Sequence, residues 1–131
     1  MIPVQHPLVV PPMLDAEYRR NPVPAVPREA WKAFGGKHET ATALEPVQKG
    51  ICPYCEEKLA TWGHHIDHIV PKTGHPPGTF LFENLVLCCI NADQLPAPSG
   101  TSCGHFRGEE YDPALFIKPT ESDCSEYFGW I

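Results

Sequence analysis

The chain has 131 residues, of which 42% are hydrophobic and 20% are charged, values typical of one globular domain with a modest core. Its formal net charge of −6 excludes a general electrostatic attraction to nucleic acid, membranes or other polyanions, although a local positive site such as a bound metal is compatible with it. Of the 131 residues, 16 are proline, a share far above the usual level of about 5%. We therefore expect much irregular structure and a stabilising element besides the core.

The sequence has no run of about 18 apolar residues, and its first residues lack the charged start and apolar core of a signal peptide. We therefore expect a cytoplasmic location. Thiols stay reduced in that compartment, so the six cysteines are expected to bind metal rather than to form disulfides.

The first 49 residues combine a proline-rich segment with short helices. Residues 1–27 are predicted to form an extended arm that lies on the domain or on a partner, because proline fixes φ and removes a backbone donor. Residues 28–34 are predicted to form a short helix that stops at Gly35 and Gly36. A weaker helical pattern covers 38–44, with Pro46 limiting its continuation.

The elements after residue 49 are predicted to be short. Two strands are expected at 64–70 and 83–89, the second with a buried Leu-Val-Leu core. Gly and Pro make 73–80 a turn-rich loop, and composition makes 91–102 a loop as well. A final element begins at 103–108, and the aromatic residues of the closing segment are expected to pack on the core.

Cys52 and Cys55 are spaced for binding one metal ion, since two thiolates at this spacing can both reach a tetrahedral zinc at about 2.3 Å. A structural site needs four ligands, and the other two are expected to be Cys103 with either Cys88 or Cys89. Adjacent strand residues point to opposite faces, so only one of that pair is expected to serve. The alternatives are buried free cysteines or a redox pair, which normally lies near a βαβ unit that is absent here. Cys124 has no partner at metal spacing.

The stretch HHIDHIVPK, residues 64–72, places His65, Asp67 and His68 close together. Two imidazoles and a carboxylate suit a hard divalent cation that acts on phosphate, and a histidine with an ordinary pKa of about 6.5 can be a general base. The alternative is an exposed strand edge with polar side chains. His64 and His75 are interpreted as exposed polar residues.

Asn84 and the run Cys103-Gly104-His105 are each weak signals. An asparagine before an apolar run is usually a turn residue or a cap. What carries weight is the order along the chain: Cys-x-x-Cys, then Asp-His, then Asn, then Cys-x-His.

That order resembles the HNH endonuclease family, whose Asp-His-Ile-x-Pro segment appears here as residues 67–71. The family's Asn-Leu-x-x-x-Cys segment appears as 84–89, which selects Cys89 over Cys88 as the zinc ligand. ICPYCE, HIDHIVPK, ENLVLCC, CGHFRG and PTESDCSEYF are most similar to the small HNH proteins of Septu and retron-associated anti-phage systems, which work beside an ATPase. The resemblance covers roughly residues 50–128.

The resemblance implies an α+β fold: a small zinc-stabilised ββα-metal domain over 50–131, with residues 1–49 as a proline-rich arm and short helices that pack on the core or on a partner. The sequence departs from the family in two places. Gly104 separates the last cysteine from His105, and thirteen residues, 90–102, lie between Cys89 and Cys103. Arg107 stands where relatives often carry lysine, which conserves charge but not geometry.

The resemblance also implies the site residues. Asp67 and His105 would hold a catalytic Mg²⁺ or Mn²⁺, His68 would accept a proton from the attacking water, and Asn84 would hold the His68 loop. Lys72 and Arg107 are candidate phosphate contacts. A structural zinc would be bound by four cysteines: Cys52, Cys55, Cys89 and Cys103. His65 has three open roles: metal ligand, partner of Asp67, or structural residue.

The implied function is hydrolysis of DNA phosphodiester bonds, as the nuclease effector of a bacterial anti-phage system. Because the chain is acidic, its ATPase partner is expected to supply much of the DNA contact. The alternatives are a zinc-stabilised binding module without catalysis and an HNH nuclease toxin. A zinc nucleobase deaminase is disfavoured, because its His-x-Glu motif precedes Cys-x-x-Cys.

Overall fold

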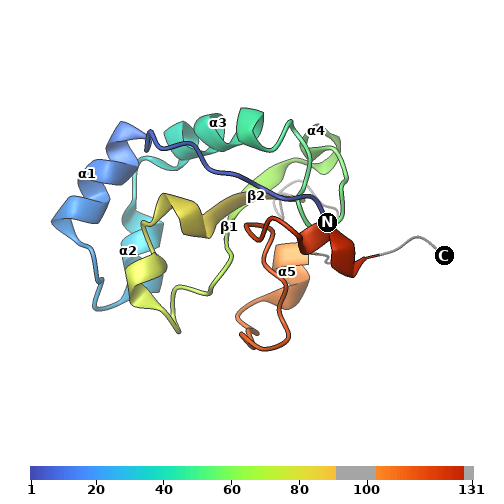
Figure 1. The fold of residues 1–131 in the computed structure, drawn as a ribbon. Coiled ribbons are helices and arrows are strands. Elements are labelled where there is room, and N and C mark those ends of the chain that lie inside the picture. The colour runs from blue at the N-terminus through green and yellow to red at the C-terminus, as the bar shows by residue number, and fades with distance from the viewer. Residues whose placement is uncertain (91–102, 129–131) are drawn as a thin grey trace.

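A computed structural model describes residues 1–90 and 103–128, apart from the side chains of His105 and Phe106. Its helices and strands follow in this order: α1 (Pro12–Arg20), α2 (Pro27–Ala33), α3 (Lys37–Val47), α4 (Leu59–Trp62), β1 (His64–His68), β2 (Leu85–Cys89) and α5 (Cys103–Arg107). In Figure 1, the hairpin β1–β2 lies in the middle, with α1 and α2 toward one end and α4 and α5 toward the other. The predicted loop 91–102 falls outside the described residues.

The prediction of an extended arm over residues 1–27 is wrong for its middle part, where α1 forms. Pro11 and Pro12 sit at the start of this helix, where the missing N–H of proline removes no helical hydrogen bond. Leu14 gives α1 its anchor, because its side chain is completely buried. Proline richness therefore marks the start of a helix here as well as irregular chain.

The first residues do run extended, and they lie on the domain. The N–H of Ile2 donates to the carbonyl of Pro53 at 3.0 Å, and the N–H of Val4 donates to Pro119 at 2.7 Å. Further along, Nε2 of His6 donates to the carbonyl of Leu85 at 2.7 Å. Figure 1 shows this segment crossing from α1 to the C-terminal part of the chain. The prediction left open whether this segment lies on the domain or on a partner, and in the structure it lies on the domain.

The helix predicted at 28–34 is confirmed as α2, which begins on Pro27 and ends at Ala33. The helix predicted at 38–44 is α3, which is longer than expected. It includes Pro46 in its last turn and ends one residue later, where the N–H of Gln48 donates to Leu44 at 3.1 Å. Pro46 is thus compatible with the last turn of α3, and the helix ends directly after it.

Both predicted strands form, each shorter than its pattern suggested. β1 and β2 pair antiparallel, with His64 opposite Cys89 and His68 opposite Leu85. A 3₁₀ turn over Phe82–Asn84 precedes β2 and delays its start. All five residues of β2 are buried, as the Leu-Val-Leu core predicted. A further short 3₁₀ turn occupies Pro76–Gly78 within the predicted loop 73–80.

The helices and the hairpin share one hydrophobic core. Leu14 of α1, Leu44 of α3 and Phe34, which follows α2, pack in the same cluster as Phe80 and Leu87. Polar contacts also cross the boundary at residue 50. The side-chain amide of buried Gln48 donates to the carbonyl of Leu87 at 2.8 Å and accepts from the N–H of that residue at 2.6 Å. Residues 1–49 are thus packed against the hairpin.

The closing segment differs from its prediction at the two described aromatic residues near its end, and Trp130 lies outside the described residues. Tyr127 and Phe128 are 61% and 52% exposed, so these two aromatic residues do not pack on the core. Phe116 packs instead, with its ring 6.4 Å from that of Tyr54 and 4.8 Å from the guanidinium of Arg107. None of the helices in the described residues has the length and apolar character that crossing a bilayer requires.

Candidate functional site

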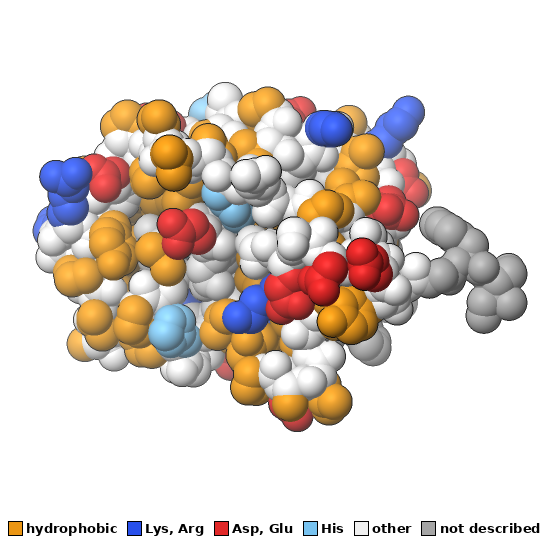
Figure 2. All heavy atoms as spheres, in the orientation of Figure 1, with side chains coloured by type: hydrophobic (Ala, Val, Ile, Leu, Met, Phe, Trp, Pro, Cys, Tyr) orange, Lys and Arg blue, Asp and Glu red, His pale blue; other side chains and the backbone are white. Residues whose placement is uncertain are grey.

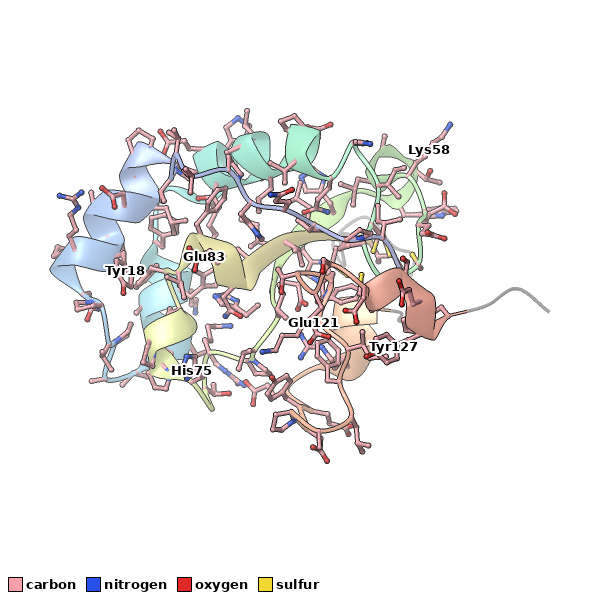
Figure 3. The ribbon with its side chains drawn as sticks, in the orientation of Figure 1. Tyr18, Lys58, His75, Glu83, Glu121 and Tyr127 are labelled. Carbon is pink, nitrogen blue, oxygen red and sulfur yellow. The ribbon has the colours of Figure 1, made fainter. Side chains whose placement is uncertain are left out.

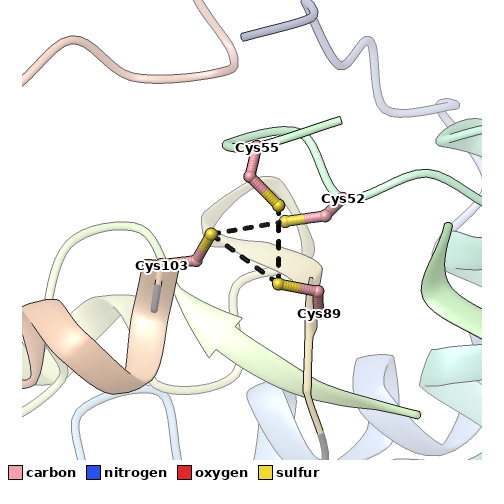
Figure 4. A group of neighbouring side chains, drawn as sticks. All are labelled: Cys52, Cys55, Cys89 and Cys103. Atoms are coloured by element: carbon pink, nitrogen blue, oxygen red, sulfur yellow. Dashed lines mark hydrogen bonds between the residues drawn. The ribbon is translucent and has the colours of Figure 1, made fainter. Parts of the chain in front are cut away.

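Four cysteines from three parts of the chain meet at one point (Figure 4). Cys52 and Cys55 come from the turn before α4, Cys89 ends β2, and Cys103 begins α5. Their sulfur atoms all lie within 4.8 Å of one another. The sulfurs of Cys52 and Cys103 are 3.9 Å apart, and those of Cys89 and Cys103 are 3.7 Å apart. Cys55 completes the group, 3.5 Å from Cys89.

These distances fit a tetrahedral zinc site. Four thiolates at about 2.3 Å from one zinc ion are about 3.8 Å apart, whereas a disulfide needs a sulfur separation of about 2.05 Å. All six cysteines are free thiols. The four-cysteine cluster can therefore hold zinc.

Cys88 lies beside this cluster without joining the four. Its sulfur accepts a hydrogen bond from the backbone N–H of Gly104 at 3.1 Å, and its side chain is completely buried. The structure thus brings Cys89, rather than Cys88, together with the other three cysteines. Cys124 is buried elsewhere, where its thiol points to the carbonyl of Pro119 at 3.9 Å.

Asp67 is a buried carboxylate with two strong partners. The hydroxyl of Tyr54 donates to its Oδ2 at 2.8 Å, and Nη2 of Arg107 donates to the same oxygen at 3.0 Å. The Arg107 side chain is only 12% exposed, and Nη2 also donates to the carbonyl of His68 at 2.8 Å. Arg107 therefore holds β1 against the start of the C-terminal segment, an arrangement in which its charge is directed inward.

His65 and Asp67 lie on the same face of β1, two residues apart, and both meet the first turn of α5. A β-carbon at Gly104 would be 2.8 Å from Oδ1 of Asp67 and 3.1 Å from Nε2 of His65. Only glycine allows this close approach. Nδ1 of His65 contacts the carbonyl of Ile90 at 2.8 Å, which orients the ring. The side chain of His105, in the same turn as Gly104, lies outside the described residues.

His68 follows Asp67 and is only 6% exposed. Its Nε2 donates to the carbonyl of Thr79 at 2.9 Å, which leaves the lone pair on Nδ1. The ring stands nearly perpendicular to that of Trp31, with a centroid distance of 4.6 Å. Burial, with the charges of Lys72 and Arg107, lowers the pKa of His68 to about 3. At neutral pH, His68 is therefore an uncharged imidazole.

The side chain of Asn84 clamps the chain that follows His68. Its Oδ1 accepts from the N–H of Val70 at 2.8 Å, and its Nδ2 donates to the carbonyls of Val70 and Gly78 at 2.9 and 3.1 Å. Its backbone carbonyl also accepts from Ile69 at 2.9 Å. Asn84 fixes the exit of β1 to the loop that returns toward β2.

The remaining predicted residues lie around this centre. Lys72 is half-buried, and burial lowers the pKa of its ammonium group. His75 is exposed, as predicted, whereas His64 at the start of β1 is half-buried.

Sequence reasoning missed three residues that contact the site: Trp31, Tyr54 and Thr79. Tyr54 had a signal, because it lies inside the Cys-x-x-Cys turn, where a large aromatic residue can reach across the cluster. Trp31 lies 37 positions before His68 and Thr79 contributes only its backbone carbonyl, so no local pattern indicated either.

No protein-family model matches the sequence. A curated protein of Vibrio cholerae serotype O1 biovar El Tor, named "Retron Vc95 putative HNH endonuclease", is 30% identical over 98 residues. This match confirms the resemblance to the HNH endonuclease family. The HNH relative is a retron protein, so it supports the retron-associated group in particular, and the likeness to Septu proteins stays a prediction.

The aligned part is 72% of this chain but 44% of the HNH relative, so the chain spans less than half of that protein's length. A match over 72% of the chain is longer than the whole of residues 50–131. The similarity to the HNH relative therefore includes residues before Gly50, whereas the sequence motifs lie within residues 50–128.

Proposed function

We propose that this chain is a metal-dependent HNH endonuclease that hydrolyses phosphodiester bonds in DNA. One observation carries the proposal. The end of β1 presents Asp67 toward α5 and His68 toward Thr79, and the three side-chain hydrogen bonds of Asn84 fix the chain directly after them. A polar strand edge has no need of such a clamp, whereas a catalytic pair needs fixed geometry.

Asp67 and His105 are the residues proposed to hold the catalytic ion, Mg²⁺ or Mn²⁺. Oδ2 of Asp67 is occupied by Tyr54 and Arg107, so its Oδ1, which faces the turn of α5, is the oxygen offered to a metal. His65 reaches the same place through Nε2, which favours a role as metal ligand or partner of Asp67 over a purely structural role. When bound, such an ion stabilises the charge that grows on the phosphate and the leaving oxygen.

His68 is the proposed general base. Since Thr79 fixes the hydrogen on Nε2, the lone pair of Nδ1 is the atom that would accept a proton from the attacking water. Asn84 is proposed as a positioning residue, because its side-chain hydrogen bonds go to the backbone of Val70 and Gly78. Lys72 remains a proposed phosphate contact. For Arg107, the buried contacts favour holding Asp67 in place over binding substrate directly.

The proposed zinc would be structural. The cluster joins the turn at 52–55, the end of β2 and the start of α5. β2 pairs with β1, which carries Asp67, and α5 provides the turn that faces this carboxylate. Because the site would not exist in the unfolded chain, the free energy of zinc binding would contribute to the stability of the fold. The apparent binding free energy of zinc in small zinc domains is roughly 10–16 kcal/mol. Loss of zinc should separate α5 from the hairpin.

The biological setting is proposed from the family. Retron-associated HNH proteins resemble this chain, so we infer a nuclease effector of an anti-phage system that acts in the cytoplasm with an ATPase partner. The partner would bring much of the DNA affinity, because phosphate neutralisation usually dominates binding and this chain is acidic.

The test is cleavage of plasmid by the purified chain with Mg²⁺ or Mn²⁺, with and without the proposed ATPase partner. We expect His68→Ala to lose at least 100-fold in rate, a typical value for removing a general base. His38→Ala is the matched control, because that histidine is exposed on α3. Equal inertness of wild type and His68→Ala, even with the ATPase present, would favour a non-catalytic zinc module instead.

A further inference from the structure

Four of the chain's ten basic residues are associated with α2, the helix that carries Trp31. Arg28 and Lys32 belong to this helix, the ammonium of Lys37 lies over the Trp31 ring, and Lys72 is close enough to Arg28 and Lys37 to interact electrostatically with both. We call this group the Trp31 cluster. Its members are Arg28, Lys32, Lys37 and Lys72. Three of them precede residue 50, outside the segment in which the sequence motifs placed the nuclease. In a chain of net charge −6, such a concentration of positive charge calls for a physical explanation.

Trp31 connects the cluster to His68. The ammonium of Lys37 lies 5.6 Å from the centroid of the Trp31 ring, and the His68 ring packs nearly perpendicular to the same ring at 4.6 Å. Nζ of Lys37 also donates to the carbonyl of Lys32 at 3.1 Å. The Trp31 ring thus contacts both the ammonium of Lys37 and the imidazole of the proposed base.

Lys72 approaches the same centre from the loop after β1. Burial is the main cause that lowers the pKa of both His68 and Lys72. The charge of Lys72 also acts on His68, and Lys72 itself interacts with the charges of Glu109, Arg28, Asp67 and Lys37, so these groups are close in space. Arg28 is neutralised by an ion pair with Glu109. In the described part of the chain, neither Lys37 nor Lys72 forms an ion pair with a carboxylate, so both positive charges stay available.

Helix stability does not account for Lys37. It is the first residue of α3, whose N-terminus has no side-chain cap. A cation at this end of a helix is unfavourable, because the helix dipole is positive there. Burial also lowers the pKa of Lys37, so the ammonium is held at a cost to its own charged form. The favourable contacts of Lys37 are instead those with the Trp31 ring and the carbonyl of Lys32, which hold its ammonium beside α2.

Elsewhere the visible surface is unsuited to a polyanion. The face drawn in Figure 2 carries a group of acidic side chains near the C-terminal segment, and its Lys and Arg side chains stand apart from one another. Glu121 is labelled in this region in Figure 3, and Glu83 is a further acidic side chain on the same face, closer to α1. A DNA strand would meet repulsion on that face.

We propose that Lys37 and Lys72 bind backbone phosphates of DNA on either side of the bond to be cut, so that the α2–α3 junction completes the nuclease site. This inference rests on the proposed function and names the part of the chain that holds its substrate. Trp31 acts as the shared support: it keeps the ammonium of Lys37 and the imidazole of His68 in one arrangement. The first 49 residues then contribute to the site itself as well as to its surroundings.

The test measures binding separately from cleavage. A fluorescent DNA duplex is titrated with the full chain in EDTA at several salt concentrations, for wild type, Lys37→Ala, Lys72→Ala and the double variant. Each lost phosphate contact should reduce the slope of log K against log salt by about 1 and weaken binding several-fold at low salt. Lys37→Arg should retain the slope.

Lys58→Ala is the matched control, because this exposed lysine projects from the opposite end of the molecule near α4 (Figure 3). It removes one charge and should leave the slope unchanged. Lys37→Ala removes an unfavourable charge from the start of α3 but also the contacts of Lys37 with Trp31 and the Lys32 carbonyl. Thermal melts therefore accompany each titration, and binding is compared at a temperature at which every variant is folded.

The outcomes separate the two proposals. If the double variant binds and cuts as wild type does, the phosphate assignment is wrong while the nuclease stands. If Lys58→Ala lowers the slope as much as Lys37→Ala, binding follows net charge and the assignment is again wrong. If the lysines control binding but no metal or partner yields cleavage, the nuclease proposal fails and the phosphate surface stands.

Discussion

The hydroxyl of Tyr54 donates a 2.8 Å hydrogen bond to the carboxylate of Asp67. Tyr54 lies between two of the clustered cysteines, and Asp67 lies on β1, so this bond ties the metal-binding turn to the proposed catalytic strand. Burial and the charge of Asp67 raise the pKa of the Tyr54 phenol well above its ordinary value, which keeps the hydroxyl protonated as a donor. The cysteine cluster and the nuclease site are therefore linked through one side chain.

Tyr54→Phe tests this link. The variant removes one hydrogen bond to a buried carboxylate and should lower the free energy of unfolding by about 1.5–3 kcal/mol, measured by urea denaturation. Cleavage should fall with it, while zinc content stays the same. Tyr18→Phe, at a partly exposed tyrosine of α1 labelled in Figure 3, should change neither. Equal stability of the two variants would show that the bond contributes little.

Zinc content tests the four-cysteine cluster. Native mass spectrometry should find one zinc in wild type and a large loss of zinc in Cys55→Ser, whose cysteine is the exposed member of the group. Cys88→Ala should keep its zinc, because that thiol lies beside the cluster. Retention by Cys55→Ser together with loss by Cys88→Ala would mean that the wrong cysteine of the adjacent pair has been assigned.

Gly104→Ala tests the approach of α5 to β1. Its new methyl group would lie 2.8 Å from Oδ1 of Asp67, so α5 has to shift, at a cost of about 1–3 kcal/mol in the free energy of unfolding. Gly35→Ala is the control, since the only side-chain atom near its β-carbon is 4.0 Å away. Thermal melts of both variants give the comparison. A Gly104→Ala protein as stable as Gly35→Ala would contradict the close packing.

Asn84→Ala tests the clamp on the His68 loop. The substitution leaves the N–H and carbonyl of Val70 and the carbonyl of Gly78 without their side-chain partner, and we expect a loss of about 2–4 kcal/mol in stability. Hydrogen exchange resolves the effect by residue. The amide of Val70 should exchange faster relative to that of Leu87, which Gln48 still holds. Parallel acceleration of both amides would indicate global unfolding rather than a local clamp.

The sequence predicted the hairpin and the cysteine cluster because both depend on local signals. Alternation and β-branched residues mark strands, and the spacing of Cys52 and Cys55 restricts how the chain can bind a metal. The choice between Cys88 and Cys89 needed the register of a family motif. The structure then brings Cys89 to the cluster and leaves Cys88 beside it.

What the sequence could not predict depends on tertiary packing. Trp31 reaches His68 only because α2 folds back over the hairpin, and no spacing in the sequence encodes that. Arg107 was expected to face substrate because it is charged, but it pairs with Asp67 inside the protein. The helix α1 was missed because proline can start a helix as well as prevent one.

Gln48 and His6 also solve a problem that a two-stranded sheet creates. The outer side of β2 would otherwise offer unpaired backbone groups to any passing strand, the usual route to edge-to-edge aggregation. The amide of Gln48 satisfies both backbone groups of Leu87, and His6 occupies the carbonyl of Leu85. The N-terminal segment and the end of α3 thus take the place of a third strand, and they protect an apolar strand from recruiting one.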